Sequence, residues 1–364
     1  MNIVFVVPGM SFGGAERVIS ILANKLVDRG HQVNIGVFNI EAQNCLYELD
    51  NRVKLDFIKS FRFHPVSNMK KSLSNLENYF STVHPSVVIS FTNVVASQCS
   101  IVCKKNNIPM IFSERNDPKK LLHGIKNNIF QHVLVHNVQN MVFQTRGAMN
   151  MYPHRVQAQS EIILNPLELQ NLSSIRKGER ENLIVSVGRL APQKRHDILI
   201  KAFAKISDKY PDYILKIYGE GSLREADENL ISSLHLEDRI ILMGTSKDIL
   251  AQICNATLFA FTSDYEGLPN ALIEAMALGL PCVSTKCSPG GAEELIQDGI
   301  NGRLVDCNDH EEFAQTMDEM LSNYETSKKM GIEAMKIRER VDVEYIVDKW
   351  EAFIEKVIMV GDKE

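Results

Sequence analysis

Apolar runs of strand length alternate with amphipathic stretches along the first half of the chain. They predict strands at residues 3–7, 32–38, 87–91 and 110–112, and a helix at 15–29 that Gly30 closes. Strands that alternate with helices are typical of a parallel α/β sheet. The first half therefore predicts one α/β domain, and we place its boundaries at residues 1 and 165.

The same alternation restarts in the second half. Apolar runs predict strands at residues 183–187, 213–218, 239–243, 257–263 and 282–284, with a helix from about Asp197. Between the halves, residues 165–181 are polar, contain Pro166 and Gly178 and show no clear periodicity, so they predict a linker. The chain thus predicts two Rossmann-like domains, at 1–165 and 166–364.

Length and composition agree with two domains. The chain has 364 residues, of which 45% are apolar and 23% are charged, as in ordinary globular proteins. In the last stretch, residues 343–360, Trp350, Phe353 and Ile354 recur at helical spacing. We expect a core-facing helix there that can cross back to the first domain.

The amino terminus and the cysteines indicate where the chain works. Residues 1–10 have no basic start and become a glycine loop after a strand's length, so they predict neither a signal peptide nor a membrane span. We therefore expect the chain to stay in the cytoplasm. The seven cysteines are odd in number and lack paired C-x-x-C spacing, which argues against a disulfide framework or structural zinc. Cys99 and Cys103 are predicted to share one helix face.

Charge is distributed unevenly between the predicted domains. Residues 1–165 hold 17 lysines and arginines against 10 aspartates and glutamates, a net +7, whereas residues 166–364 hold 23 against 35, a net −12. A basic domain of this kind indicates an anionic partner, either an acidic membrane surface or a phosphate-bearing acceptor. Nucleic acid is the rival partner, but we find no recognised nucleic-acid motif and therefore expect no nucleic-acid partner. Residues 57–71 mix aromatic and cationic side chains and read either as a segment at a bilayer interface or as a solvated loop.

The motif DYEGLPNALIEAM, residues 264–276, lies where a predicted strand turns into a helix. Pro269 suits the first helical turn, and the backbone N–H groups of Gly267 and Leu268 can receive a phosphate there. A nucleoside diphosphate sugar fits this arrangement, because Glu266 could accept hydrogen bonds from the sugar and Glu274 from the ribose. An isolated pair of acids at this spacing is more often part of a plain surface helix.

Two further loops follow predicted strands, at the edge where open α/β sheets bind ligands. After 183–187 comes Gly188 with Arg189 and Lys194, two cations that can neutralise the charge on a departing diphosphate. After 213–218 comes the turn 219–221, which begins with Gly219. Taken alone, the first reads as a solvated loop, and the second reads equally well as a plain turn.

In the first domain, Gly13, Gly14 and Glu16 follow the first strand and open a helix. Glycines at such a turn let the backbone approach a ligand closely. A nicotinamide site would require G-x-G-x-x-G and an acid at the end of the second strand, and the chain has neither. The interpretation as a dinucleotide site is therefore weakened.

With the extended motif GLPNALIEAMALGLPCVS, the second domain resembles the retaining glycosyltransferases of family 4. The stretch GRL-x3-K and the turn at Gly219 resemble that family's donor elements, and residues 288–305 fit its late loop, helix and strand. The resemblance implies catalytic residues Glu266, Arg189 and Lys194, and donor-binding residues Gly188, Gly219, Gly267, Leu268, Pro269, Asn270 and Glu274.

The glycine turn of the first domain resembles the family's amino-terminal loop, which faces the donor phosphate and the acceptor. We therefore group Gly13, Gly14 and Glu16 with Arg115 as a phosphate and acceptor cleft. At Arg115 the chain departs from the family pattern, because many members carry a histidine there near the donor sugar. A guanidinium stays charged and cannot act as a general base, so the role of that histidine is left unassigned.

The resemblance covers nearly the whole chain and implies the GT-B fold, two Rossmann-like domains facing a central cleft. The first domain would take the acceptor and the second the nucleotide sugar. The resemblance also implies retention of the anomeric configuration, with no metal and no other cofactor. In agreement, the chain lacks the D-x-D element of metal-dependent transferases.

The expected activity is transfer of a hexose or N-acetylhexosamine from a nucleotide sugar, with a uridine donor as the first expectation. The chain is similar to bacterial enzymes that extend lipid-diphosphate-linked glycans for surface polysaccharide or glycoprotein assembly, so we expect a peripheral enzyme at the inner face of the cell membrane. Two other interpretations stay open: a GT-B epimerase that needs no acceptor, and a nucleotide-sugar-binding protein without turnover. Incubation with nucleotide sugars, alone and with a lipid-linked acceptor, separates the three.

Overall fold

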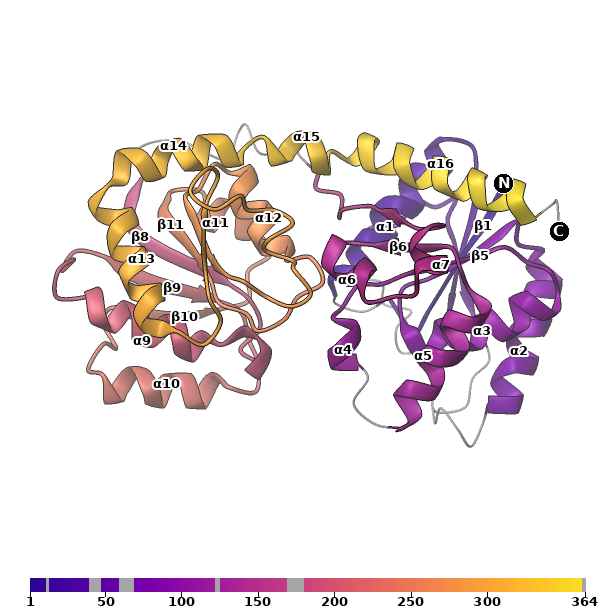
Figure 1. Cartoon of the computed structure of the whole chain (residues 1–364), viewed down its shortest axis with the longest axis horizontal. Coiled ribbons are helices and arrows are strands. Elements are labelled where there is room, and N and C mark those ends of the chain that lie inside the picture. Colours follow the sequence, from indigo (N-terminus) through magenta and orange to yellow (C-terminus); the bar gives the residue numbers. More distant parts are fainter. Residues whose placement is uncertain (11–12, 39–46, 59–68, 122–124, 169–179, 362–364) are drawn as a thin grey trace. The chain divides into compact units, whose positions relative to one another are not determined.

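The structure is a computed structural model that describes residues 1–10, 13–38, 47–58, 69–121, 125–168 and 180–361 (Figure 1). The chain divides into two compact units: Met1–Pro166 with Val343–Glu364 form unit 1, and Leu167–Asp342 form unit 2. Each unit is built on one parallel β-sheet with helices packed against it (Figure 1). The predicted fold class of two parallel α/β domains is confirmed.

Unit 1 contains a seven-stranded sheet with the order β3-β2-β1-β4-β5-β6-β7. Its strands are β1 Asn2–Val7, β2 Gln32–Val37, β3 Lys54–Phe57, β4 Val87–Ser90, β5 Met110–Ser113, β6 Met141–Phe143 and β7 Glu161–Ile162. The apolar pattern predicts β1, β2, β4 and β5 but not the other three. Those three are short, and no residue of β3 or β7 is fully buried, so they leave no long apolar run in the sequence.

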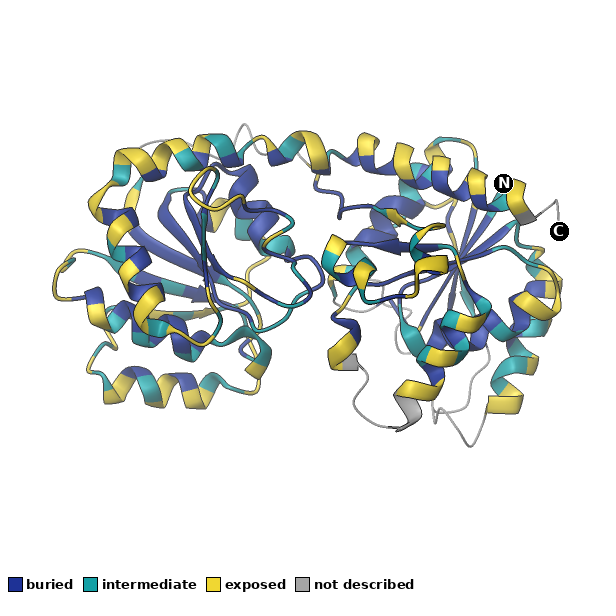
Figure 2. Cartoon of the chain, in the orientation of Figure 1, coloured by how far each residue is buried: buried dark blue, intermediate teal, exposed yellow. Residues whose placement is uncertain are grey.

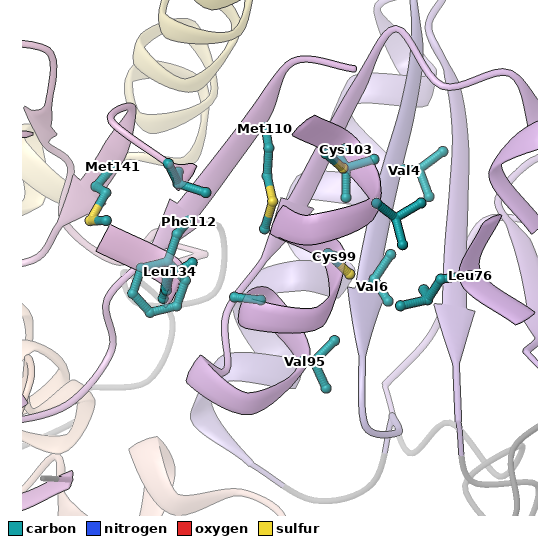
Figure 3. Close-up of a cluster of buried hydrophobic side chains, with 14 of the residues drawn as sticks. Val4, Val6, Leu76, Val95, Cys99, Cys103, Met110, Phe112, Leu134 and Met141 are labelled. Atoms are coloured by element: carbon teal, nitrogen blue, oxygen red, sulfur yellow. The ribbon is translucent and has the colours of Figure 1, made fainter. Parts of the chain in front are cut away.

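Helices cover both faces of this sheet and enclose its core. They are α1 Gly14–Asp28, α2 Met69–Val83, α3 Asn93–Lys105, α4 Pro118–Leu121, α5 Ile125–Asn137, α6 Arg146–Asn150, α7 His154–Gln157 and α16 Val343–Gly361. In Figure 3, Cys99 and Cys103 of α3 lie beside Val4 and Val6 of β1 within one apolar cluster. The prediction that the two cysteines share a helix face is confirmed, and burial raises the pKa of both thiols.

Helix α16 packs on unit 1 through its apolar face. Its Trp350 is 0% exposed and stacks on Phe91, with the ring centroids 5.9 Å apart. On the polar side of the helix, Arg29, the C-cap residue of α1, donates a hydrogen bond to Glu351 at 2.7 Å and pairs with Glu344 at 2.9 Å. The compact unit that holds the first sheet therefore ends with α16, and unit 2 ends at Asp342.

The position of α16 changes the charge of both units. Unit 1 holds 20 lysines and arginines against 16 aspartates and glutamates, a net +4, and unit 2 holds 20 against 29, a net −9. The acidic residues of α16 lie against basic residues of α1, such as Lys25, which pairs with Glu344 at 2.8 Å. The charge asymmetry between the units remains, but α16 reduces it.

Unit 2 contains a six-stranded parallel sheet with the order β10-β9-β8-β11-β12-β13. Its strands are β8 Glu181–Val187, β9 Ile214–Tyr218, β10 Ile240–Gly244, β11 Ala256–Phe261, β12 Cys282–Thr285 and β13 Arg303–Val305. Its helices are the 3-10 helix η2 Pro192–Lys194, α9 His196–Ile206, α10 Arg224–Ser233, α11 Ile249–Ile253, α12 Asn270–Ala277, α13 His310–Ser322, α14 Tyr324–Ala334 and α15 Ile337–Val341. Figure 2 shows the inner strands buried and the outer faces of the helices exposed. The pattern predicts every strand here except β13, of which only Val305 is fully buried.

One predicted helix of unit 2 is wrong. Residues 288–305 were expected to form a loop, a helix and a strand. They instead run through successive turns before strand β13. Gly290 has φ +96°, outside the helical region, at the start of the stretch. At its end, the Asn301 side chain donates to Leu295 O at 3.1 Å and accepts from Gln297 N at 2.7 Å. These contacts hold a turn and interrupt the helical repeat.

Two predicted segments lie partly outside the described residues. They are the core of the linker, residues 169–179, and most of the aromatic and cationic stretch, residues 59–68. Within the described part of the chain, no helix combines the length and apolarity that a membrane crossing requires.

Candidate functional site

The predicted donor residues follow three strands that are neighbours in the sheet of unit 2. Strand β8 lies between β9 and β11, and Val187 at its end is paired with Tyr218 at the end of β9. The loops after parallel strands all leave from the carboxyl edge of the sheet, which is where open α/β sheets bind ligands. The sheet therefore brings the Gly188 loop, the Gly219 turn and the Glu266 loop to one edge.

Close packing of the loops requires a glycine at Gly219 and leaves little room beside Gly188. A Cβ atom on Gly219, which has φ +149°, would lie 1.9 Å from Gly188 O. A Cβ atom on Gly188 would lie 3.2 Å from Cδ of Lys194. The predicted residues Gly188, Gly219 and Lys194 are thus in contact.

Lys194 and Glu266 form an ion pair, with 2.7 Å between Nζ and Oε1. Their side chains are only 13% and 14% exposed, and Lys194 Nζ lies 4.8 Å from the centre of the Phe261 ring. Gln193 donates to the same Glu266 oxygen at 2.9 Å and to Tyr265 O at 2.6 Å. Sequence analysis assigned Lys194 to the diphosphate and Glu266 to the sugar, and it did not foresee that the two residues pair with each other.

Arg195 joins the same two loops at a second point. Its guanidinium donates to Asp264 at 3.1 Å and to Asp197 at 3.0 Å, and it also bonds Asn308. Its backbone lies in the left-handed region, with φ 48° and ψ 42°, between η2 and α9. The side-chain bonds to Asp197 hold the pKa of the Arg195 guanidinium above its usual range.

Arg189 differs from Lys194. Arg189 is exposed, and its side chain makes no hydrogen bond or ion pair with any described residue. The structure therefore places one predicted cation against a carboxylate and leaves the other open to an incoming anion.

The start of α12 offers backbone donors. The helix begins at Asn270, with Pro269 as its N-cap residue and no side-chain cap. The N–H groups of Gly267 and Leu268 precede the helix and find no hydrogen-bond acceptor among the described residues. Such groups at a helix start favour an anion.

Glu274 lies inside α12 and is 5% exposed. It shares this helix with Asn270, whereas Glu266 lies in the loop before it. The two acids of the motif thus occupy separate environments.

His196 is a buried residue of this edge that sequence analysis did not single out. It begins α9, and neither ring nitrogen has a hydrogen-bond partner. Burial, and next the charge of Lys194, lowers the pKa of this imidazole to about 4. The ring is therefore neutral at pH 7.

The glycine turn of unit 1 is built around Glu16. Gly13 is the N-cap residue of α1, and a Cβ atom there would lie 2.0 Å from Oε2 of Glu16. Tyr47 donates to Gly13 O at 2.9 Å, and burial raises the pKa of Glu16. Gly14, the first residue of α1, is exposed.

Arg115 follows β5 and packs on an aromatic side chain. Its guanidinium carbon lies 4.0 Å from the centre of the Phe91 ring, and Nη1 donates to Asn165 at 2.5 Å. The residue is half-buried overall, but its Nε and Nη2 atoms are buried, and burial lowers the pKa of the guanidinium to about 9. Among the described residues, Arg115 makes no hydrogen bond to Gly13, Gly14 or Glu16, so these four predicted residues are not joined directly.

Sequence analysis missed several polar residues that the structure places at these edges: Thr92, Asn93, Gln193, Arg195 and His196. Each lies within a few residues of a strand end or of a predicted site residue, so a search of every strand end would have found them. Over the described ranges, no group of three or more histidine, cysteine, aspartate or glutamate side chains is arranged to hold a metal ion.

Comparison with known proteins places this site in context. Residues 170–337 match the family described as glycosyl transferases group 1. An uncharacterised glycosyltransferase of Haemophilus influenzae is 25% identical over 345 residues, which cover 94% of this chain and 97% of that protein. The GalNAc-alpha-(1->4)-GalNAc-alpha-(1->3)-diNAcBac-PP-undecaprenol alpha-1,4-N-acetyl-D-galactosaminyltransferase of Campylobacter jejuni is 26% identical over 363 residues, 98% of this chain and 99% of that enzyme.

The fold has close counterparts among solved structures. The crystal structure of Anabaena HepE in complex with UDP and glucose superposes with a TM-score of 0.81 at 21% identity, covering 98% of this chain and all of that one. At this identity the likeness shows the fold alone. Together with the two parallel sheets, it confirms the predicted GT-B architecture.

Proposed function

We propose that this chain is a glycosyltransferase that transfers a hexose or N-acetylhexosamine from a uridine diphosphate sugar to a glycan acceptor. Its match to the glycosyl transferases group 1 over residues 170–337 and its GT-B fold support this. We propose that it is a family 4 enzyme that retains the anomeric configuration and needs neither a metal nor another cofactor. The observation that supports this best is the edge of unit 2, where the Lys194–Glu266 pair lies beside the open N–H groups of Gly267 and Leu268.

In the proposed reaction, the bond between sugar C1 and the diphosphate oxygen breaks, and the acceptor oxygen bonds to C1 on the same face. The leaving diphosphate takes the acceptor's proton. Negative charge grows on the diphosphate as it leaves, and Arg189 and Lys194 stabilise it. To do so, Lys194 exchanges the Glu266 carboxylate for phosphate oxygens, which frees Glu266 to accept hydrogen bonds from sugar hydroxyls.

The remaining donor residues frame the nucleotide. Gly188 and Gly219 keep side chains away from the diphosphate, and the start of α12, from Gly267 to Asn270, receives it. Glu274 accepts hydrogen bonds from the ribose. The donor would thus lie along the carboxyl edge of the second sheet, with its sugar at Glu266.

We propose a lipid-diphosphate-linked glycan as the acceptor, at the inner face of a bacterial cell membrane. The activity for which the Campylobacter jejuni relative is named and the net charge of +4 on unit 1 support this. The protein should bind anionic vesicles more than neutral ones and leave them as salt rises, because exposed charges are screened over about 8 Å at physiological ionic strength. Equal binding to both vesicle types would contradict the membrane partner.

Variants of Glu266 test the proposed activity. Glu266→Gln keeps the shape but removes the charge, and Glu266→Asp retracts the carboxylate by one methylene, so both should lose sugar transfer while calorimetry shows normal affinity for uridine diphosphate. Glu237→Gln, on an exposed residue of the same unit, is the matched control. Near-normal transfer by a folded Glu266→Ala protein would falsify the role of Glu266.

Incubations of the wild-type protein separate the proposed activity from its rivals. Release of uridine diphosphate only when a lipid-linked acceptor is present supports transfer. An isomerised donor without acceptor identifies an epimerase, and binding without any product identifies a non-catalytic binding protein.

A further inference from the structure

Buried polar atoms without partners collect at the ends of two adjacent strands of unit 1. They are Thr92 Oγ1, Asn93 Oδ1, and Nε and Nη2 of Arg115. Ser90 of β4 pairs with Phe112 of β5, so residues 92–93 and 115 follow neighbouring strands at the same sheet edge. The contact of Arg115 with Phe91 brings its guanidinium next to the start of this segment. Unpaired buried groups are rare in folded proteins, and a gathering of them indicates a missing ligand.

The two open nitrogens of Arg115 form one edge of its guanidinium. Nη1 is occupied by Asn165 at 2.5 Å, which leaves the Nε–H and an Nη2–H parallel to each other. This edge is the fork that binds two oxygens of a carboxylate or phosphate at once. Stacking on Phe91 fixes the plane of the fork.

Helix α3 adds backbone donors to the same edge. Thr92 is its N-cap residue, but the hydroxyl makes no capping hydrogen bond. The first backbone bond of the helix runs from Ala96 N to Thr92 O, so the N–H groups of residues 93–95 have no acceptor within the helix. A 13-residue helix presents these donors with a positive partial charge.

The nearby carboxylates do not occupy the fork. Glu114 Oε2 accepts from Tyr152 at 2.7 Å, and Oε1 accepts from the backbone of Arg115 and Asn116. Asp117 Oδ1 accepts from Lys119 N at 2.8 Å. A buried guanidinium that bonds no carboxylate is costly, and an incoming anion would remove that cost.

We propose that the Arg115 fork, the Thr92 hydroxyl and the start of α3 form a site for an oxyanion, a phosphate or carboxylate, carried by the acceptor substrate. Asn93 Oδ1 and Asp117 Oδ2, both unpaired, accept hydrogen bonds from hydroxyl groups beside that anion. The identification of the acceptor as the carrier rests on the proposed function, whereas the oxyanion site rests on unit 1 alone.

The test uses the full chain labelled with 15N at arginine Nε. The Arg115 signal is identified by its absence from Arg115→Lys, and inorganic phosphate and then acetate are titrated in the presence of excess uridine diphosphate. The Arg115 signal should move and saturate with at least one ion, and the ion that binds tells a phosphate from a carboxylate. Thr92→Val should weaken that binding at least about tenfold, the loss expected for one hydrogen bond to a charged group.

Arg155, whose guanidinium donates to Val135 O on the surface of the same unit, supplies an internal control. The inference is wrong if the Arg115 signal moves no more than the Arg155 signal in both titrations. If phosphate or acetate moves Arg115 but the wild-type protein transfers sugar to no acceptor, the oxyanion site stands and the proposed function fails. If transfer is observed and the Arg115 signal does not respond, the proposed function stands and the oxyanion site fails.

Discussion

The carboxyl edges of the two sheets differ in whether their cationic side chains have carboxylate partners. In unit 2, two cations of the edge are bonded to carboxylates: Lys194 pairs with Glu266, and Arg195 pairs with Asp264. In unit 1, the guanidinium of Arg115 is stacked on Phe91, but two of its nitrogens bond nothing. The strands beneath both edges are parallel and follow a similar order.

This difference teaches how each edge would meet a ligand. At unit 2, a diphosphate bound as proposed would displace Glu266 from Lys194, which would couple binding to a rearrangement. At unit 1, an oxyanion would fill bonds that are already open, so the edge is organised before the ligand arrives. Four experiments can break or sharpen this comparison.

The largest effect should come from Trp350→Ala, which removes the aromatic support of the unit 1 edge. Trp350 is fully buried, and truncation of such a side chain costs about 3–5 kcal/mol in the free energy of unfolding. Urea unfolding followed by circular dichroism measures the loss. Tyr345→Ala, at a residue 44% exposed on the same helix, should cost far less. Equal losses would show that α16 does not support unit 1 through its buried face.

The next effect concerns the paired edge. Lys194→Ala should lower turnover about 10²–10³-fold, because in the proposed reaction Lys194 stabilises charge that grows in the transition state. Glu274→Ala should mainly weaken donor binding. Steady-state kinetics with varied donor separates the two, and Lys201→Ala, on an exposed lysine of the same unit, is the control. A Lys194 variant with normal turnover and only a raised donor KM would reverse the assignment.

His196 makes the stability of unit 2 depend on pH between about 6.5 and 4. The folded pKa of about 4 lies below the ordinary 6.5, so the stability that this group contributes is full above pH 6.5 and is lost as pH falls toward 4. The loss is about 3 kcal/mol at most. Unfolding of His196→Leu measured from pH 7 to 4 should show a flatter profile than the wild type. Parallel profiles would mean that the imidazole is not buried in its neutral form.

The smallest effect tests whether the left-handed backbone at Arg195 is strained. Arg195→Ala removes the side-chain bonds and keeps a Cβ in the left-handed region, whereas Arg195→Gly removes both the bonds and the strain. The glycine variant should therefore be more stable than the alanine variant by about 1 kcal/mol in urea unfolding. An alanine variant that matches or exceeds it would show that the backbone here is not strained.

The strands that the sequence predicts are those with long apolar runs. β1 and β8 are buried on both faces and therefore read as continuous apolar stretches. Edge strands such as β3 bury little and leave no such signal. The helix wrongly expected before β13 depends on Gly290 and on the side chain of Asn301, whose effects on the backbone the apolar pattern does not record.

The site residues were predictable as types and as neighbours of strand ends, but their partners were not. Gln193 and Glu266 are 73 residues apart in sequence and meet only because β8 and β11 are adjacent. The open fork of Arg115 depends on Asn165 and Phe91, which lie on other segments of unit 1. Pairing across a sheet edge depends on which strands are neighbours in the fold, so the local pattern of apolar and polar residues does not predict it.

Helix α16 belongs to unit 1 but is synthesised last. Unit 1 is interrupted by the whole of Leu167–Asp342, so its sheet emerges long before the helix that carries Trp350. At roughly 10 residues per second, the delay is about 18 s. During that interval unit 2 can fold as one continuous stretch, while the Phe91 face of unit 1 stays without its aromatic cover. Nascent chains halted after unit 2 should therefore bind chaperones through unit 1.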